Sequence, residues 1–364
     1  MHPAVDQLIA SRSIDLDLLS TLLHSDSPQL RDALFAASRS ETERVYGNEV
    51  FMRGLIEFSS YCRNDCLYCG LRRSHRELPR YRMTLEEILA CCRLGYQFGM
   101  RTFVLQSGED AWWTDERLCQ VVASIRSEFA DCAITLSVGE RSRESYQRLF
   151  DSGANRYLLR HETADAAHYA QLHPSDMSFA HRIQCLHTLK EIGYQVGCGF
   201  MVGSPGQTDA TLLQDLQFIT SFRPHMVGIG PFVATQHTPF ANEPNGEVEL
   251  TLRLLAIIRL LHPTVLLPAT TALGSLHPLG REQGIRAGAN VVMPNLSPVE
   301  NRKQYNIYDN KICLGDDVAH CRSCLERRIE SVGRHLVVAR GDYRHDTATP
   351  TATGNTPSDP TPNS

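Results

Sequence analysis

The sequence predicts an α/β protein whose centre is a (β/α)8 TIM barrel. Two observations carry this prediction. Strand-like apolar segments alternate with amphipathic, helix-like segments through most of the chain, and each strand-like segment ends in polar, Gly or Pro residues. The length of 364 residues also suffices for one large barrel. An open, doubly wound sheet is the alternative arrangement of the same alternating elements.

Four regions are expected along the chain. Residues 1–48 should form an N-terminal helical segment, because their apolar residues recur at helical spacing. Residues 49–300 should form the barrel, and residues 301–344 a C-terminal extension that contains cysteines. Residues 345–364 have no apolar periodicity and are rich in Thr, Pro and Asn, so this tail should be disordered.

Eight strands and seven intervening helices are expected in the barrel. The strand candidates are 53–60, 102–107, 133–138, 155–162, 195–203, 225–232, 264–271 and 289–294. The helix candidates are 84–98, 114–129, 141–151, 178–192, 208–222, 247–261 and 277–286. Thr84 and Glu87 have the spacing of a capping box, which favours a helix start at the first of these.

Composition excludes some classes of function. The net charge is −5, the pI is near 6.3, and no block of Lys and Arg stands out. A nucleic-acid partner would require a basic surface, so none is expected. No apolar run has transmembrane length, and the N-terminus lacks the apolar region of a signal peptide. We therefore expect a soluble, cytoplasmic protein with no membrane partner.

Three thiols lie within eight residues after the first predicted strand. Cys62, Cys66 and Cys69 have the spacing Cys-x3-Cys-x2-Cys. A structural zinc site uses four ligands, commonly as two separated pairs, and disulfide frameworks belong to small secreted chains. Closely spaced thiolates suit an iron–sulfur cluster better. Three ligands on a cluster of four irons would leave one iron open, which indicates chemistry and not electron storage alone.

The cysteine motif, with Tyr68 before its third cysteine, resembles that of the radical S-adenosylmethionine (SAM) enzymes. The resemblance implies that Cys62, Cys66 and Cys69 hold a 4Fe-4S cluster. SAM would bind the unique iron, and one electron would cleave it to a 5′-deoxyadenosyl radical. Tyr68 would lie near the adenine of SAM.

Side-chain parity predicts a polar lumen. Neighbouring residues of a strand point to opposite faces, so Arg156, Leu158, Arg160 and Glu162 share one side of strand four, and Thr135 faces the same way on strand three. An arginine inside a barrel is costly to bury alone. Arg160 should therefore meet a carboxylate, either Glu162 or one on a ligand. An internal ion pair that serves only the fold is the alternative.

The resemblance also implies a set of SAM contacts. The segment at 107–109 resembles the Gly-Gly-Glu segment that receives the SAM amino group, with Ser in place of the first Gly. The segment 199–208 is Gly-rich but lacks the Lys of a phosphate-binding loop, and it resembles the backbone that approaches adenine. Arg182 would neutralise the SAM carboxylate, although by itself it reads as an exposed helix charge. The implied cofactor-binding residues are Tyr68, Gln106, Gly108, Glu109, Glu162, Arg182, Met201, Gly203 and Gly230.

Longer segments resemble one subfamily, the FeFe-hydrogenase maturases of the HydE group within the biotin-synthase-like enzymes. These segments are CLYCGLRR (66–73), RYRMT (80–84), VLQSGED (104–110), RYLLRHET (156–163), MVGIGPF (226–232), PATTA (268–272) and GANVVMPN (288–295). The resemblance implies a role in building the diiron site of the H-cluster. The substrate would be a cysteine-bound Fe(CO)2CN synthon, and the partners would be other maturation proteins and a one-electron reductant. The implied substrate contacts are Arg160, Thr135, Ser107, Thr270, Thr271, Met293 and Tyr305.

A second set of thiols, Cys313, Cys321 and Cys324, lies in the C-terminal extension with the spacing Cys-x7-Cys-x2-Cys. In the family this position carries an auxiliary cluster in some members, usually 2Fe-2S. His320 is a neighbouring fourth ligand in the sequence. Zinc, or thiols without metal, are the alternatives.

Two other functions stay open from the sequence. One is another biotin-synthase-like reaction, such as sulfur insertion or methylornithine formation, for which inward-facing cysteines such as Cys198 would matter. The other is a cluster carrier without catalysis, which would need no SAM contacts. The remaining cysteines fall in apolar contexts and are expected to pack as small core residues in a reducing compartment.

Overall fold

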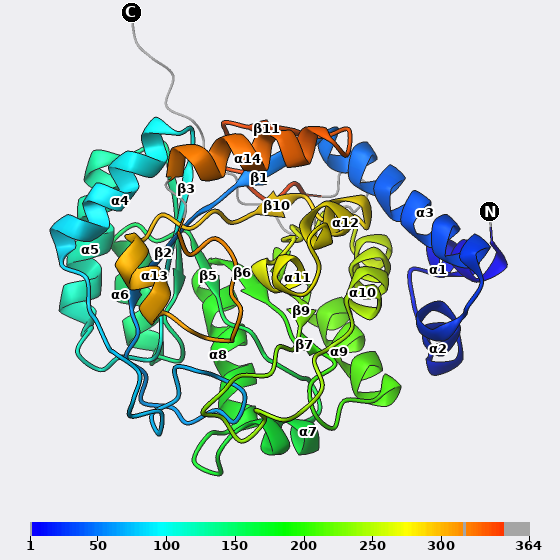
Figure 1. The fold of residues 1–364 in the computed structure, drawn as a ribbon, viewed down its shortest axis with the longest axis horizontal. Helices are drawn as coiled ribbons and strands as arrows, with labels where there is room; N and C mark the ends of the chain where they lie inside the picture. The colour runs from blue at the N-terminus through cyan, green and yellow to red at the C-terminus, as the bar shows by residue number, and fades with distance from the viewer. Residues whose placement is uncertain (1, 316–317, 346–364) are drawn as a thin grey trace, which may run out of the picture.

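The computed structural model describes residues 2–315 and 318–345, with residues 318–320 described by their backbone alone. The expected disordered tail therefore lies outside the described residues from 346 onwards. Figure 1 shows strands at the centre of the molecule and helices around them. The N-terminal helices, which the sequence predicts within residues 1–48, extend to one side.

Three helices form the N-terminal segment: α1 (Pro3–Ser11), α2 (Leu16–His24) and α3 (Pro28–Tyr46). Each begins at a side-chain cap; Asp15, for example, accepts a hydrogen bond from the Leu18 amide. Helix α3 lies against α10 (Val248–Leu261). Helix α10 is rich in apolar residues and, with its two arginines, is buried along nearly its whole length, because it is enclosed between α3 and the sheet.

Six parallel strands form the largest sheet, in the order β2-β3-β4-β5-β6-β8. They are β2 (Gly54–Ser59), β3 (Thr102–Ser107), β4 (Ala133–Ser137), β5 (Arg156–Leu158), β6 (Gln195–Cys198) and β8 (Met226–Val227). Every pairing in this sheet is parallel and joins neighbours in the chain order, apart from the short β7. This order confirms the α/β fold class.

Further pairings lead from β8 back to β2. Met226 bridges Leu266, Pro268 bridges Val291, and β10 (Val291–Val292) pairs with β1 (Glu49–Met52), which runs directly into β2. Leu55 of β2 also bridges Asn295. The described pairings therefore return to their starting strand, as a (β/α)8 arrangement requires.

The predicted seventh strand is the poorest match. Segment 264–271 makes only isolated bridges, and Thr271 already begins helix α11 (Thr271–Leu276). Pro263 and Pro268 lack the amide hydrogen that a ladder needs, which explains the irregular pairing. Predicted strands five and six are each divided, so that β7 (Met201–Val202) and β9 (Gly230–Pro231) form a separate pair at their ends.

The predicted helices are all present, with bounds shifted by a few residues. They are α4 (Leu85–Gln97), α5 (Asp115–Glu128), α6 (Arg143–Asp151), α8 (Phe179–Ile192), α9 (Asp209–Phe222), α10 and α12 (Gly280–Arg286). The capping box of Thr84 and Glu87 is confirmed. The sequence reasoning missed short elements: α7 (Ala166–Leu172), α11, α13 (Val299–Gln304), α14 (Val318–Glu330) and β11 (His335–Val337), which pairs with β1.

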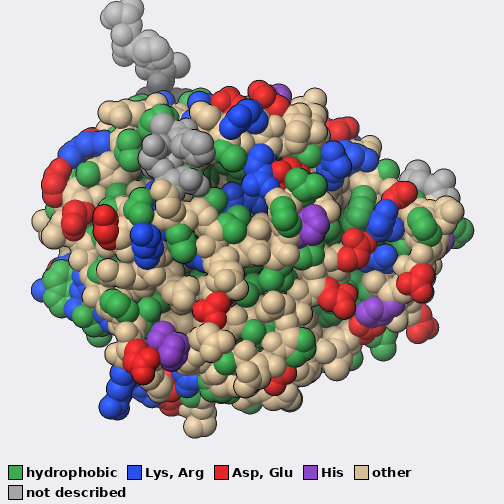
Figure 2. Space-filling model, in the orientation of Figure 1, with side chains coloured by type: hydrophobic (Ala, Val, Ile, Leu, Met, Phe, Trp, Pro, Cys, Tyr) green, Lys and Arg blue, Asp and Glu red, His purple; other side chains and the backbone are tan. Residues whose placement is uncertain are grey.

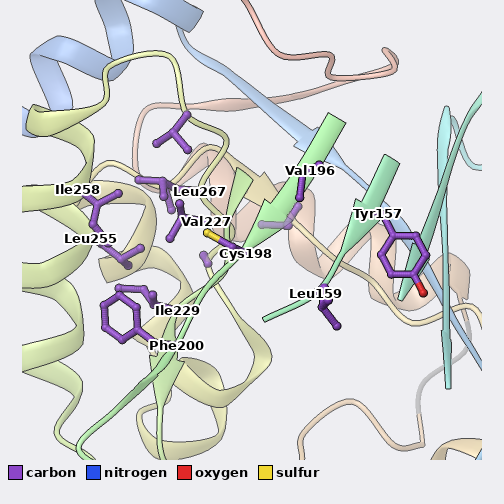
Figure 3. Packing of buried hydrophobic residues seen from close by; sticks show 14 of the residues in the cluster. Tyr157, Leu159, Val196, Cys198, Phe200, Val227, Ile229, Leu255, Ile258 and Leu267 are labelled. Atoms are coloured by element: carbon purple, nitrogen blue, oxygen red, sulfur yellow. The ribbon is translucent and has the colours of Figure 1, made fainter. Parts of the chain in front are cut away.

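The apolar core lies between the sheet and the helices. Figure 3 shows Cys198 of β6 among Val227, Leu267 and the α10 side chains Leu255 and Ile258. Cys198 is fully buried in this layer, so it points toward the helices and away from the lumen. The expectation that it could face inward is wrong, because strand parity places it opposite Gly197. Among the described residues, every helix is too short or too polar to cross a bilayer.

Candidate functional site

A cavity of about 340 Å³ lies at the carboxyl ends of the strands. Among the predicted residues it is lined by Tyr68, Cys69, Gln106, Arg160, Glu162, Met201, Gly230, Thr270, Thr271 and Met293. Its other walls are mainly apolar, with Leu55, Leu158, Met226, Phe232 and Val233 among them. These residues come from strands all around the barrel. The cavity thus brings together most of the cofactor and substrate contacts that the resemblance implied.

The cysteine loop leaves β2 and closes one end of this cavity. Cys62, Cys66 and Cys69 are partly buried and lie near one another. The pKa of Cys66 is raised far above its usual value, mainly by burial and then by the charges of the other two thiols. Burial, followed by the charge of Cys62, raises the pKa of Cys69 to about 12. Three thiols that disfavour ionisation in this way require a nearby cation to become ligands. Their environment therefore suits iron, whose positive charge would offset both effects.

The Cys62 backbone is approached closely by the end of β3. A Cβ atom on Gly108 would lie 2.4 Å from the Tyr61 carbonyl oxygen and 2.6 Å from the Cys62 Cβ, so only glycine fits there. The Glu109 amide lies 3.4 Å from the Cys62 sulfur. Segment 107–109 is thus placed against the cysteine loop.

Tyr68 is held in the cavity wall by a buried histidine. His173 Nδ1 donates to the Tyr169 carbonyl at 3.0 Å, and its Nε2 lies 3.2 Å from the Tyr68 hydroxyl. Burial lowers the pKa of His173 to about 3, so the ring is neutral and its Nε2 accepts from Tyr68. His173 was not predicted; its position at the C-cap of α7, where the α7–α8 connection begins, gave no signal in the sequence.

Arg160 and Glu162 meet across the cavity wall. Their Nη2 and Oε2 atoms lie 3.2 Å apart, as parity predicted, although the geometry is not that of a directed hydrogen bond. Glu162 has φ 67°, a left-handed conformation that is costly for a carboxylate side chain. About a third of the Arg160 side chain is exposed and the residue lines the cavity, with its Nε and Nη2 atoms buried without a hydrogen bond.

Arg182 is buried, so its interpretation as an exposed helix charge is wrong. Its side chain is 9% exposed, and its Nε lies 2.5 Å from Glu140 Oε1. Nη1 donates to the Arg160 carbonyl at 3.2 Å. Glu109 turns away from the cavity: its Oε1 accepts from the Glu140 amide and its Oε2 pairs with Arg63. Arg182 and Glu109 thus lie in one charged layer outside the cavity lining.

Several predicted residues lie elsewhere. The Ser107 hydroxyl donates to the Gly108 carbonyl, Tyr305 packs with Leu71 and Leu78, and Gly203 turns at φ 74° against Gly246. None of these three is among the residues that line the described cavity. Tyr305 still touches its wall, because Gln106 Nε2 donates to its hydroxyl at 3.3 Å.

Thr135 lies deeper in the lumen. It lines a void of about 10 Å³ with Arg53 and Arg156, and Met226 separates this void from the main cavity. The Thr135 Oγ1 is buried without a hydrogen bond. Its inward direction was predicted correctly from strand parity, but it is one layer below Arg160.

A buried ion pair that the sequence reasoning missed forms part of the cavity wall. Lys311 Nζ contacts Glu57 Oε1, and Glu57 Oε2 accepts from Asn295 Nδ2 at 2.7 Å. The parity of β2 could have revealed Glu57, because it shares a face with Leu55, which also lines the cavity. Lys311, and Tyr308 beside it, come from the irregular C-terminal extension and carried no such pattern.

Cys313, Cys321 and Cys324 line one pocket of about 50 Å³. This pocket shares Leu55, Thr271, Met293 and Lys311 with the main cavity, so the two compartments are neighbours. Arg281 Nη2 lies 3.6 Å from the Cys313 sulfur. The side chain of His320 is outside the described residues.

Comparison with known proteins agrees with this geometry. Residues 56–219 match the model of the Radical SAM superfamily. The chain is 45% identical over 323 residues to the "[FeFe] hydrogenase maturase subunit HydE" of Thermotoga maritima, covering 89% of this chain and 92% of the relative. The crystal structure of methylornithine synthase (PylB) superposes with a TM-score of 0.81 at 27% identity, covering 92% of this chain and 97% of that one. The maturase HydG of Carboxydothermus hydrogenoformans shares the fold, with a TM-score of 0.73 at 20% identity over 91% and 79% of the two chains.

Proposed function

Because the chain belongs to the HydE family of radical SAM hydrogenase maturases, we propose that its substrate is a small, cysteine-bound Fe(CO)2CN synthon used to assemble the diiron site of the FeFe-hydrogenase H-cluster. The observation that carries this proposal is the cavity of about 340 Å³ with Arg160 in its wall. That volume is at the small end of ligand pockets and suits an amino-acid-sized substrate.

The residues that would hold the cofactors fit them. Cys62, Cys66 and Cys69 offer three soft ligands whose raised pKa values call for a cation. When bound, the 4Fe-4S cluster and SAM supply reductive cleavage of the sulfonium to a 5′-deoxyadenosyl radical. Tyr68, oriented by His173, and the charged pair of Arg182 and Glu140 are proposed to position SAM beside the cluster.

The remaining cavity residues would bind the substrate and exclude water. Arg160 presents a guanidinium to the cavity and is proposed to pair with the substrate carboxylate, displacing its loose contact with Glu162. The Thr270 hydroxyl is buried without a hydrogen bond, so it can bind a substrate group without breaking an existing contact. Thr271 and Met293 line the same end of the cavity. The apolar walls would protect a reactive radical from solvent.

The C-terminal thiols are proposed to hold an auxiliary 2Fe-2S cluster. Support comes from their shared pocket and from Arg281, whose charge lies against Cys313. A cluster here would be next to the substrate cavity but outside it. Replacing Cys321 and Cys324 with Ser should remove any 2Fe-2S signal while SAM cleavage persists; loss of SAM cleavage would contradict an auxiliary role.

The central experiment is anaerobic reconstitution of the full chain with iron, sulfide, SAM and dithionite, followed by measurement of 5′-deoxyadenosine. We expect product formation in the wild type and none in Cys66→Ser, with Cys119→Ser as the control for a thiol outside the motif. Absence of product despite an intact 4Fe-4S cluster would favour a cluster carrier. Hydrogenase activation in an assay with the other maturation proteins and a one-electron reductant then tests the substrate and partner assignments.

The sulfur-insertion alternative loses its main support. Cys198 faces the helices, and Cys69 is the cysteine among the residues lining the described cavity. A second cluster held by strand cysteines would therefore lack ligands in the described part of the lumen.

A further inference from the structure

A third group of potential metal ligands lies outside both cysteine triads. It consists of Glu140, which follows β4, and His181 and Cys185 on helix α8. His181 and Cys185 are four residues apart, a spacing that brings two side chains to the same face of a helix. The ligand atoms of all three residues lie within 4.8 Å of one another. The proposed chemistry of the radical site uses neither His181 nor Cys185.

The nitrogen–oxygen distance within this group is long for a hydrogen bond, whereas the nitrogen–sulfur distance is within the range of a hydrogen bond to sulfur. His181 Nε2 lies 3.6 Å from Glu140 Oε2 and also 3.6 Å from the Cys185 sulfur. A nitrogen–oxygen separation of this size is too long for a good hydrogen bond. Ligands bound tetrahedrally to zinc at about 2.0 Å for nitrogen or oxygen and 2.3 Å for sulfur lie about 3.3–3.5 Å apart. The two separations that involve His181 are close to these values, whereas the separation of the Glu140 oxygen from the Cys185 sulfur, which lies within 4.8 Å, would have to shorten to about 3.5 Å on binding.

The surroundings provide both burial and access. Cys185 is 2% exposed, and the Glu140 side chain is 12% exposed, whereas His181 is largely open to solvent. Glu140 and His181 line a surface hollow of about 600 Å³. An ion could enter from this hollow, and water could fill its fourth position. This arrangement of three protein ligands and one open position is common in zinc enzymes.

From this geometry we propose that Glu140, His181 and Cys185 form a binding site for a divalent ion of the zinc class. One thiolate, one imidazole and one carboxylate suit zinc and exclude magnesium and calcium, which prefer oxygen ligands alone. Burial raises the pKa of Cys185, so the thiol is neutral without the ion. On binding, its proton passes to solvent and the sulfur–metal bond forms, with no change of oxidation state.

Glu140 connects this site to the cofactor layer. Its Oε2 faces His181, while its Oε1 lies 2.5 Å from Arg182 Nε. An ion at the proposed site would therefore share one carboxylate with Arg182. Since both are cations, occupancy weakens the hold of Glu140 on Arg182. The site is placed to modulate the charged layer from the outer surface, without entering the substrate cavity.

The test is zinc binding by the full-length, reconstituted holoenzyme, measured by metal analysis and zinc K-edge X-ray absorption. The proposal expects one tightly bound zinc with a single sulfur neighbour and nitrogen or oxygen ligands otherwise. Loss of a residue that only hydrogen-bonds to a metal ligand typically costs about 10–100-fold in metal affinity. His181 would be a direct ligand, so His181→Ala should weaken zinc binding by at least about 10-fold. His187→Ala, an exposed histidine on the same helix, should leave the affinity unchanged.

A second variant distinguishes loss of the zinc ligand from misfolding of the protein. Cys185→Ser should remove the sulfur signal from the zinc spectrum, whereas Cys119→Ser should retain it, with both variants checked by circular dichroism. Zinc surrounded by two or more sulfurs would show binding at a cysteine triad and would overturn the proposal. Affinity that is equal in the wild type and His181→Ala would overturn it as well.

Discussion

Replacing Lys311 with Met should destabilise the protein by leaving Glu57 as an unpaired buried charge. Both side chains are almost inaccessible, with 6% and 1% of their surfaces exposed. Lys311 Nζ also donates to the Tyr305 carbonyl at 3.2 Å and lies 5.2 Å from the centre of the Tyr305 ring. Met keeps the four-atom apolar length of the Lys stem, with sulfur in place of one methylene, and lacks the ammonium group.

The expected cost is about 3–5 kcal/mol, the usual penalty for removing one partner of a buried ion pair. For 364 residues the entropy of unfolding at the midpoint is about 0.8 kcal/mol per kelvin. The melting temperature should therefore fall by about 4–6 °C in differential scanning calorimetry. The deficit should shrink as the pH is lowered, because protonation of a buried carboxylate that has lost its cation removes the uncompensated charge.

The double variant Glu57→Gln with Lys311→Met is the control. It removes both charges and keeps an amide oxygen that can accept from Asn295, so it should recover most of the lost stability. A melting temperature of Lys311→Met equal to that of the wild type would refute the reasoning. So would a double variant whose loss equals the sum of the two single losses.

Three further predictions follow from the site and its supports. Arg160→Met should weaken substrate binding by about 10–150-fold, the equivalent of a charge-assisted hydrogen bond worth 1.5–3 kcal/mol, while cleavage of SAM without substrate persists in the 5′-deoxyadenosine assay. Gly199→Ala should cost more than about 3 kcal/mol, because φ is +153° and a Cβ would lie 2.0 Å from the Gly228 oxygen; Gly315→Ala, with open space around it, should show almost no change in melting temperature. Burial lowers the pKa of His173 to about 3, so His173 stays neutral in the native state and the unfolded state binds more protons below about pH 6.5. The free energy of unfolding should therefore fall by up to about 1.4 kcal/mol per pH unit on acidification. In urea titrations, His173→Asn should flatten this slope.

Local sequence patterns predicted the positions of helices and the directions of strand side chains, because both depend on neighbouring residues. The alternation of apolar and amphipathic segments located the helices, and the capping box at Thr84 fixed the start of α4. Parity predicted that Thr135 and Arg160 face the lumen, because alternation along a strand holds wherever the strand is regular.

The predictions that failed depended on contacts between distant parts of the chain. Arg182 is buried because Glu140, from another loop, compensates its charge, and helix periodicity contains no information on that partner. Lys311 reaches Glu57 across 254 residues. The direction of Cys198 also depends on a distant contact, because helix α10 packs against the face of β6 that carries Cys198.

Charge on the surface shows the same division between local and distant effects. Figure 2 shows Lys and Arg side chains interspersed with Asp and Glu over most of the visible face. A few of these are short-range pairs, such as Arg44 with Glu41 one helical turn away. Exposed pairs of this kind contribute little to stability. The arginines that matter most for the fold and the lumen are therefore the buried ones.

Two fully buried arginines, Arg259 and Arg53, differ in how their guanidinium groups are satisfied. Arg259 donates to the carbonyls of Gly288 and Val265, which satisfies its guanidinium. Arg53 instead has two guanidinium nitrogens without hydrogen bonds and lines the lower void of the lumen. Burial, and then the charge of Arg156, lowers the pKa of Arg53 well below its usual value. Arg259→Met should thus lose about 3–5 kcal/mol, whereas Arg53→Met should be neutral or stabilising by as much as about 4 kcal/mol. Equal losses in the two melting temperatures would show that Arg53 is needed for folding; opposite signs would mean that the lumen keeps a costly cation for a purpose other than stability.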